Sequence, residues 1–438
     1  VWCPCGQGSG SACSMVLRAS VCAWLPANVH CWWDLADGWQ KLSIMVGTTC
    51  ALVASLISAV HFSRHACNAA VPSIKFCTLK IVFMVPFFSV DAVACLLDSR
   101  SKYQVPEILT FLREFYEAVV LVAFLQLVLN CLGGPEHVAA QFAVHMQRPE
   151  HPFCLKVVPT FFKPGIHFIL AILWGLLQYV VVMILVTCAS VAIWICKLTA
   201  CVGDDTAHFW SIPLKCAKAM SCGYAMYNLT LLYFEILRNA GLAWDFENLN
   251  PEMKFICIKG VIMFTYLQGF GCTVLAKLHF FDAFTLAGTG GDGRASPEEV
   301  GDAIENLLLC VEMLLFSIMH LRAYPSREFD FTASETSSDS EGAVVGTNVG
   351  WWGMLRDIQR LGKKAMQQER MLHKLRANKL LTDDEMEEMF NAFDVKESGH
   401  ISVEQFRYML ETGNCRKDHI DNLTSTVDRD GDRCITRA

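Results

Sequence analysis

Seven stretches of this sequence are each long and apolar enough to cross a lipid bilayer, and they constrain the fold more than any other feature. A transmembrane helix needs about 20 mostly apolar residues, because the hydrocarbon core of a bilayer is about 30 Å thick. The chain is 53% hydrophobic and only 18% charged, which is too apolar for a water-soluble protein of 438 residues. Since helices satisfy their own backbone hydrogen bonds in lipid, we predict an all-α, polytopic bundle of seven transmembrane helices. The seven stretches are residues 42–62, 78–97, 108–132, 166–196, 212–236, 255–277 and 303–323.

Hydropathy and charge divide the chain into five predicted parts. An N-terminal tail precedes the transmembrane domain, and an acidic, Ser-rich linker, of the kind that is typically disordered, follows it. The predicted boundaries are 1–40 (tail), 41–324 (transmembrane domain), 325–349 (linker), 350–381 (basic amphipathic helix) and 382–438 (helical tail). Lys and Arg are more frequent in the loops after the first, third and fifth stretches, which predicts a cytosolic C-terminus and an exoplasmic N-terminus. The sequence does not identify the membrane.

Polar side chains inside the predicted spans are candidates for a functional site. A charged group at membrane depth costs at least about 2 kcal/mol, so such groups usually face one another or a watery cavity. Asp91 and Arg113 fall at similar depths on the second and third stretches, and Glu117 lies one helical turn further in. We expect a polar path lined by Asp91, Arg113, Glu117, Gln268 and Glu312. The alternative interpretation is that these groups only fix the packing of the helices.

Three lysines in the predicted spans have a simpler interpretation. Long basic side chains can lie along apolar surface while the ammonium group reaches the headgroups. We expect this of Lys215, Lys218 and Lys259.

Several motifs in the apolar part resemble those of one membrane-protein family. The segments are Phe83-Met-Val-Pro-Phe-Phe-Ser-Val-Asp91, Leu112-Arg-Glu-Phe-Tyr-Glu-Ala118, Leu132-Gly-Gly134, Leu177-Gln-Tyr-Val180 and Cys310-Val-Glu-Met313. In this order, over about residues 40–324, they are similar to the organic solute transporter alpha-subunit / transmembrane protein 184 family. The resemblance implies a seven-span, transporter-like protein. It also implies facilitated diffusion of amphipathic solutes and a small single-span partner subunit; a homo-oligomer is the other assembly we consider.

Residues 351–381 predict a basic amphipathic helix outside the membrane. Leu355, Ile358 and Leu361 recur near helical spacing, and basic residues fill much of the rest. Such a helix can lie on an anionic lipid surface or bind a calmodulin-like protein. Because Trp351 and Trp352 lead it, as interfacial anchors do, we expect contact with the membrane surface or with a partner.

The C-terminal tail resembles a pair of EF-hands. The candidate calcium ligands are Asp394, Ser398, His400 and Gln405 in the first loop, and Asp428, Asp430 and Asp432 in the second. Lys396 replaces an oxygen ligand, and Gln405 replaces the bidentate glutamate that closes such loops. The second loop reaches Ala438 before its last ligand, so we expect it to be truncated. Ca²⁺ is therefore the only cofactor that the sequence suggests.

Two functions of different classes fit these observations. The first is an integral membrane transporter-like protein with a calcium-binding EF-hand tail for regulation. The second is a non-transporting membrane scaffold, or a receptor-like protein, that anchors a calcium sensor. We do not expect an enzyme, since the polar groups are scattered singly and no phosphate loop or nucleophile motif is present in the sequence. Nothing in the charge suggests a nucleic-acid partner.

Overall fold

The computed structural model describes residues 38–68, 71–98, 105–145, 163, 165–198, 204–239, 241–243, 246, 250–281, 297–326, 350–376, 383–394, 399–412, 416–428 and 434–436. The expected tail up to residue 37, the linker at 327–349, and Ser398, Asp430 and Asp432 lie outside these residues. The elements used below are α3 (Gly38–Cys67), α4 (Pro72–Asp98), α5 (Val105–Cys131), α6 (Pro135–His145), α7 (Ile166–Leu198), α8 (Asp204–Arg238), α10 (Pro251–Lys277), α12 (Pro297–Ala323), α14 (Trp351–Arg376), α15 (Asp383–Phe393), β1 (His400–Ser402), α16 (Val403–Thr412), α17 (Lys417–Val427) and β2 (Cys434–Thr436).

Each of the seven apolar stretches lies within one long helix, apart from Leu132, which directly follows the end of α5. Four of these helices qualify as membrane spans by length and composition. The four are Trp39–Cys67, Pro72–Leu97, Ile166–Cys196 and Val300–Ala323. A fifth is the pair Phe111–Cys131 and Pro135–Ala143, if the two helices form one broken span. The described parts of α8 and α10 do not qualify. The structure thus supports a mostly helical protein with four to five candidate spans, and a total of seven stays a prediction.

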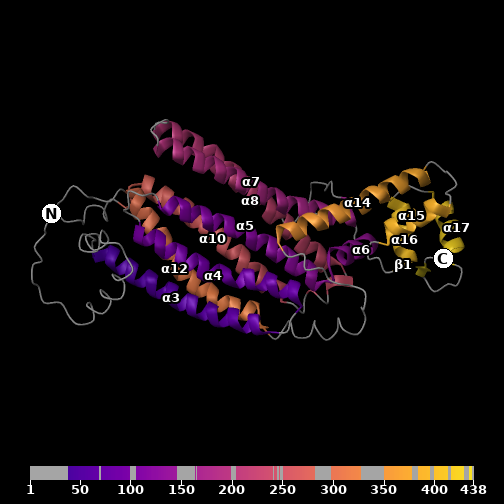
Figure 1. The fold of residues 1–438 in the computed structure, drawn as a ribbon, viewed down its shortest axis with the longest axis horizontal. Helices are drawn as coiled ribbons and strands as arrows, with labels where there is room; N and C mark the ends of the chain where they lie inside the picture. Colours follow the sequence, from indigo (N-terminus) through magenta and orange to yellow (C-terminus); the bar gives the residue numbers. More distant parts are fainter. Residues whose placement is uncertain are drawn as a thin grey trace, which may run out of the picture.

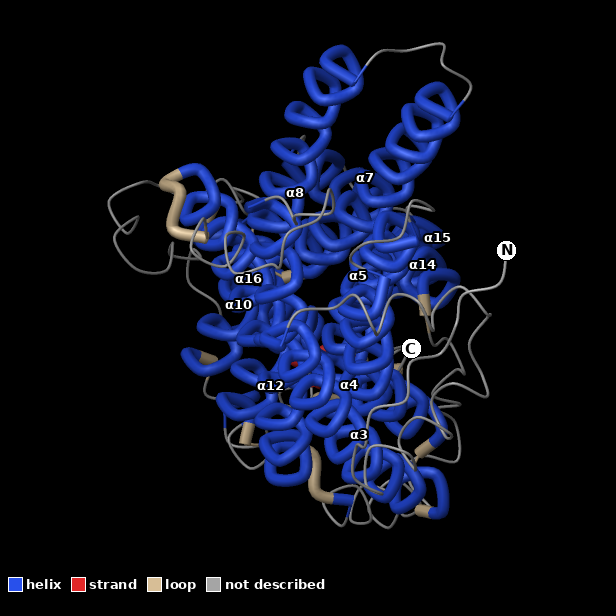
Figure 2. Tube along the Cα trace, turned by 90° about the vertical axis from the view of Figure 1, so that its left-hand side faces the viewer, coloured by secondary structure: helices blue, strands red, loops and turns tan. Residues whose placement is uncertain are grey.

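The long helices run side by side along the longest axis of the molecule (Figure 1). Helix α12 packs against α3, α4 and α10, and α5 joins α4 to the α7–α8 pair. One end of α7 and α8 projects beyond the other helices in both views (Figures 1 and 2). Large apolar side chains cover the outside of the bundle, for example Leu56 (67% exposed) and Val90 (65% exposed). Such a surface suits lipid rather than water.

A pair of glycines ends α5 and allows the chain to bend into α6. Gly133 and Gly134 have φ angles of 84° and 96°, a left-handed conformation that other residues adopt only at a cost. The N–H of Gly134 donates to the C=O of Leu129 at 2.8 Å, which satisfies a carbonyl at the end of the helix. The axes of Phe111–Cys131 and Pro135–Ala143 differ by 65°. Helix α6 is thereby turned toward the C-terminal tail (Figure 1).

The C-terminal elements form a small unit at one end of the bundle. Strands β1 and β2 pair antiparallel, with Ile401 opposite Ile435. These two side chains are buried together with Phe393, Phe406, Leu410 and Ile420. The tail therefore has an apolar core of its own, separate from the core of the bundle.

The basic helix α14 is not free in solution. Its side chains Met354, Ile358, Leu361 and Ala365 are buried in the same core as the transmembrane helices. We expected a contact with the membrane surface or a separate partner; in the structure the apolar face packs against α5 and α7 of the same chain. Trp352 remains exposed.

Candidate functional site

A group of charged side chains from four helices lies inside the bundle. Asp91 comes from α4, Arg113, Glu114 and Glu117 from α5, Lys218 from α8 and Glu305 from α12. We call these six residues the polar cluster. Arg113 and Glu117 are four residues apart, so they share one face of α5, and that face is turned away from lipid.

The polar cluster contains two ion pairs. Arg113 Nη1 lies 3.5 Å from Asp91 Oδ2, and the two side chains are only 7% and 4% exposed. Lys218 Nζ pairs with Glu114 Oε1. The Asp91–Arg113 pair is the one that the sequence suggested. Lys218, in contrast, does not extend along the helix toward the headgroups as expected, because Glu114 offers it a partner inside the protein.

Glu117 and Glu305 complete the polar cluster. Glu117 is 3% exposed, and its carboxyl group interacts electrostatically with Glu114, Arg113, Lys218 and Asp91. Glu305 interacts with Arg113 in the same way. Sequence reasoning missed Glu114, Lys218 and Glu305. Lys218 was assigned to the headgroups, and neither Glu114 nor Glu305 was among the predicted site residues; the packing of α5, α8 and α12 brings the three together.

The other two predicted site residues form a separate pair. Gln268 of α10 donates from Nε2 to Glu312 Oε1 of α12. Glu305 of the polar cluster also lies close to α10, since its Oε1 is 3.2 Å from the position that a Cβ atom at Gly269, the neighbour of Gln268, would take. Glu305 and Glu312 are two helical turns apart, or about 10 Å. The structure thus brings Asp91, Arg113 and Glu117 together, whereas Gln268 and Glu312 form a separate pair between α10 and α12.

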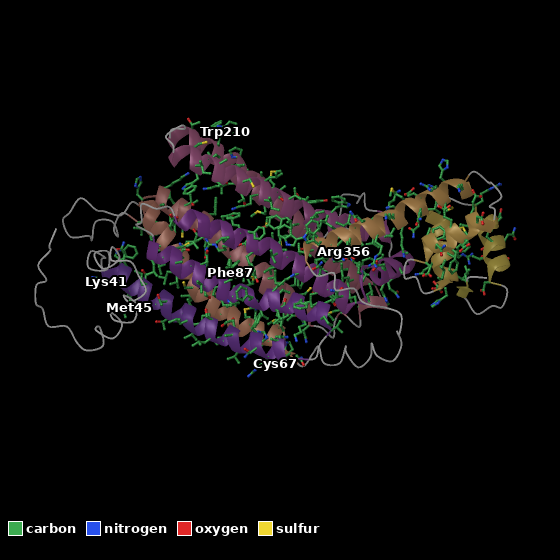
Figure 3. All side chains as sticks on the ribbon, in the orientation of Figure 1. Lys41, Met45, Cys67, Phe87, Trp210 and Arg356 are labelled. Carbon is green, nitrogen blue, oxygen red and sulfur yellow. The ribbon has the colours of Figure 1, made fainter. Side chains whose placement is uncertain are left out.

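Aromatic rings lie beside the polar cluster. The rings of Phe87 and Tyr116 stack with centroids 4.6 Å apart, and Phe87 is labelled within the bundle in Figure 3. Phe87 is one helical turn before Asp91, and Tyr116 directly precedes Glu117. A polar group and an apolar surface are therefore adjacent, which suits a molecule that has one polar end and an apolar body.

Buried histidines form a further polar group at the C-terminal ends of α3 and α12. Nε2 of His61 and Nε2 of His65 lie 2.8 and 2.9 Å from the C=O of Tyr324. The two Nε2 atoms are 3.1 Å apart. His320 is 1% exposed, and its ring contacts the ring of Tyr324 in an edge-to-face arrangement. These contacts hold the C-terminal ends of α3 and α12 together.

Two of the calcium-ligand candidates of the first loop form hydrogen bonds with other groups of the protein. Asp394 Oδ2 accepts from the N–H of Gly399 at 2.7 Å, and Gln405 Nε2 donates to the C=O of Ala140 in α6 at 3.4 Å. His400 begins β1 and is exposed. Asp428, in the second loop, is half-buried. No cluster of three or more His, Cys, Asp or Glu side chains suited to a metal occurs in the described part of the chain.

The described donors of the first loop do not match a strong calcium site. Calcium loops bind through several carboxylates, including a bidentate glutamate at the last position. Asp394 contributes one carboxylate, Gln405 is neutral, and Lys364 Nζ lies 3.4 Å from the C=O of Asp394. A cation so close to the loop opposes the binding of another.

These observations first define a class: an integral, multi-pass helical membrane protein with charged groups sheltered from lipid. The family model "Organic solute transporter Ostalpha" matches residues 43–329. Because this match covers more than half of the chain, the protein belongs to that family.

Curated relatives support the assignment. The vacuole membrane protein HFL1 of Saccharomyces cerevisiae is 27% identical over 290 residues, which cover 64% of this chain and 60% of HFL1. Protein LAZ1 homolog 2 of Arabidopsis thaliana is 24% identical over 310 residues, or 66% of this chain and 69% of the relative. Protein LAZ1 of the same plant is 21% identical over 324 residues, which cover 67% of this chain and 59% of LAZ1. The chain thus spans about 60% of the length of HFL1 and of LAZ1. No solved structure matches it.

Proposed function

We propose that this protein is a facilitative transporter of amphipathic organic solutes, with a seven-helix membrane domain and a cytosolic C-terminal tail. The observation that carries the proposal is the polar cluster, which places a buried arginine and several carboxyl groups inside a lipid-exposed bundle. Charged groups at this depth are costly, and they usually mark a path for ions or solutes. The family membership supports the same class of function.

The proposed mechanism uses the adjacent polar and aromatic surfaces. The polar end of a solute exchanges water for hydrogen bonds with Arg113, and then with Gln268 and Glu312 further along the bundle. Its apolar body lies against the stacked rings of Phe87 and Tyr116. Because none of these contacts forms or breaks a covalent bond, the chain lowers the barrier to crossing without carrying out a reaction.

A flux measurement in proteoliposomes tests this proposal. Labelled steroid conjugates are offered to liposomes that contain wild-type protein, Glu312→Gln or Arg113→Ala. We expect flux in the wild type and a loss of at least about tenfold in each variant, since a hydrogen bond to a charged group contributes about 1.5–3 kcal/mol. Unchanged flux in both variants would remove these residues from the path.

We further propose that the tail regulates this path through α6. Helix α14 contacts α6 through the Arg360–Glu136 pair, and α16 contacts it through Gln405 and Ala140. Helix α6 continues α5, which carries Arg113 and Glu117. An EF-hand pair agrees with the antiparallel β1–β2 pairing and with the Asp394–Gly399 hydrogen bond, although the donors of the first loop argue against tight calcium binding there.

Calcium binding by the second loop and anionic-lipid binding by α14 remain proposals. A hollow on α14 is lined by Arg356, Arg360, Lys363 and Lys364, among others, and it suits a lipid phosphate. Calorimetric titration of the full-length protein with Ca²⁺ tests the first proposal. Hydrogen exchange of α14 in nanodiscs with and without phosphatidylserine, for wild type and Lys363→Glu, tests the second.

A non-transporting scaffold is the second candidate function. It is favoured by the docked tail, which presents α15 to α17 at one end of the bundle (Figure 1). The relative HFL1 is described as a vacuole membrane protein, so an endomembrane is the location we propose. Two results together would favour this function: liposomes that contain the wild-type protein show no flux of any offered solute, and the tail captures a partner.

A further inference from the structure

The polar cluster holds more carboxyl groups than cations. Arg113 is paired with Asp91, and Lys218 is paired with Glu114. Glu305 interacts with Arg113 and also with Lys215, whose side chain is exposed. Both buried cations are therefore already engaged, and the carboxyl group that is left over is that of Glu117.

Glu117 is deeply buried among charges of both signs. Its side chain is 3% exposed, and among the described residues it forms no ion pair of its own. The charged groups around it are Asp91 from α4, Arg113 and Glu114 from α5, and Lys218 from α8. On α12, Glu305 interacts electrostatically with Arg113. An unpaired carboxylate in this position is strongly disfavoured, because it loses its hydration and is repelled by Asp91 and Glu114.

The surroundings of Asp91 indicate independently that the polar cluster lacks a hydrogen-bond donor. The Asp91 side chain is 4% exposed, and neither Oδ1 nor Oδ2 accepts a hydrogen bond from the described residues. A buried carboxylate normally accepts several hydrogen bonds. An ionised Glu117 offers only acceptors, whereas a protonated one adds an O–H donor to the polar cluster.

We propose that Glu117 is a proton-binding site within the polar cluster. Its carboxylate takes one proton from a hydronium ion in the water that enters the path and becomes a neutral acid; it returns the proton to a water molecule, which becomes hydronium, when the path opens again. Binding of the proton does not depend on transport. The linked statement, that the passage of a solute past Arg113 depends on this proton, rests on the proposed function.

Infrared difference spectroscopy of the full-length protein in nanodiscs tests the site with the proton itself as the probe. A buried, protonated carboxyl group gives a C=O stretching band that disappears when the proton leaves. We expect such a band in the wild type during a pH titration, its absence in Glu117→Gln and its presence in the control Glu252→Gln, which changes an exposed carboxyl group on α10. A spectrum of Glu117→Gln with the wild-type band would overturn the proposal.

Glu117→Asp provides a second, independent test that does not depend on the folding of the Gln variant. It keeps a carboxyl group but moves it by one methylene, so we expect the band at a shifted frequency; a spectrum identical to that of the wild type contradicts the assignment. The flux assay is then run at several pH values. If the band follows Glu117 but flux is absent, the transport proposal fails and the proton site stands. If flux occurs without the band, the proton site fails alone.

Discussion

The side chain of Gln126, near the C-terminal end of α5, pairs with the backbone of Gly350, 224 residues further along the chain. Gln126 Nε2 donates to the C=O of Gly350 at 2.9 Å, and the N–H of Gly350 donates to Gln126 Oε1 at 2.8 Å. Gly350 has a φ angle of 100°, which favours glycine. The pair fixes the beginning of α14 against the bundle, and it connects the tail to the helix that carries half of the polar cluster.

Replacement of Gln126 should release α14. In Gln126→Leu both hydrogen bonds are lost, and we expect docking to weaken by about 1–3 kcal/mol, because two backbone groups lose their partner. Hydrogen exchange of the α14 amides should then be roughly tenfold faster or more. Gln178→Leu is the matched control, since Gln178 joins α7 to Ser221 of α8. Equal exchange of α14 in the two variants would contradict the role given to Gln126.

The Arg360–Glu136 pair should contribute to the same docking. Arg360 is half-exposed, whereas Glu136 is 17% exposed, so solvent screening limits the expected loss to about 0.5–1 kcal/mol. We expect Glu136→Arg and Arg360→Glu each to speed up exchange of α14, and the double variant to restore part of the protection. If the loss of protection in the double variant equals the sum of the losses in the two single variants, these side chains do not interact.

Asp357 should make the docking of α14 depend on pH. Burial raises the pKa of this carboxyl group from its ordinary value of 3.8 to about 6, and the nearby Glu136 adds to the rise, against the effects of Arg360 and Arg356. Since the raised pKa belongs to the docked state, its contribution is fully present below about pH 4 and is lost as the pH rises through about 6. The loss is of the order of 1–3 kcal/mol.

Hydrogen exchange at several pH values checks this dependence, after correction for the intrinsic exchange rate. The wild type should lose protection of α14 between pH 4 and about 7. Asp357→Asn should show a flat profile, and Asp418→Asn, at an exposed position on α17, should resemble the wild type. A wild-type slope in Asp357→Asn would assign the effect to another group.

Gly175 should be required for close packing of α7 on α8. A Cβ atom at this position would lie 2.4 Å from Asn228 Nδ2, so Gly175→Ala forces the helices apart or moves a buried amide, at a cost of about 1–3 kcal/mol. Gly223→Ala, with no atom within 4 Å of its Cβ position, should be neutral or slightly stabilising. Thermal unfolding in detergent compares the two; equal melting temperatures would contradict the predicted contact.

Long-range contacts limited what the sequence could predict. Helices with strong apolar patterns, such as α3 and α7, were predictable because lipid imposes length and composition on a span. The Asp91–Arg113 pair followed from depth along two antiparallel helices. The Gln126–Gly350 pair did not, because no periodic pattern links one glutamine to a backbone group beyond a long linker. Docking of α14 on the bundle of its own chain was not predicted for the same reason: an amphipathic face suits a lipid surface and a helix bundle equally well.

Above all, we propose that the polar cluster lines the path of a solute. The most direct test of this proposal is the rate of solute flux in proteoliposomes for the double variant Asp91→Asn/Arg113→Gln, which removes both charges of the buried pair with little change in volume. Val90→Ala, on the lipid-facing side of α4, is the control. We predict at least about a tenfold loss of flux in the double variant, and unchanged flux in the control, with similar melting temperatures. Wild-type flux in the double variant would contradict the account.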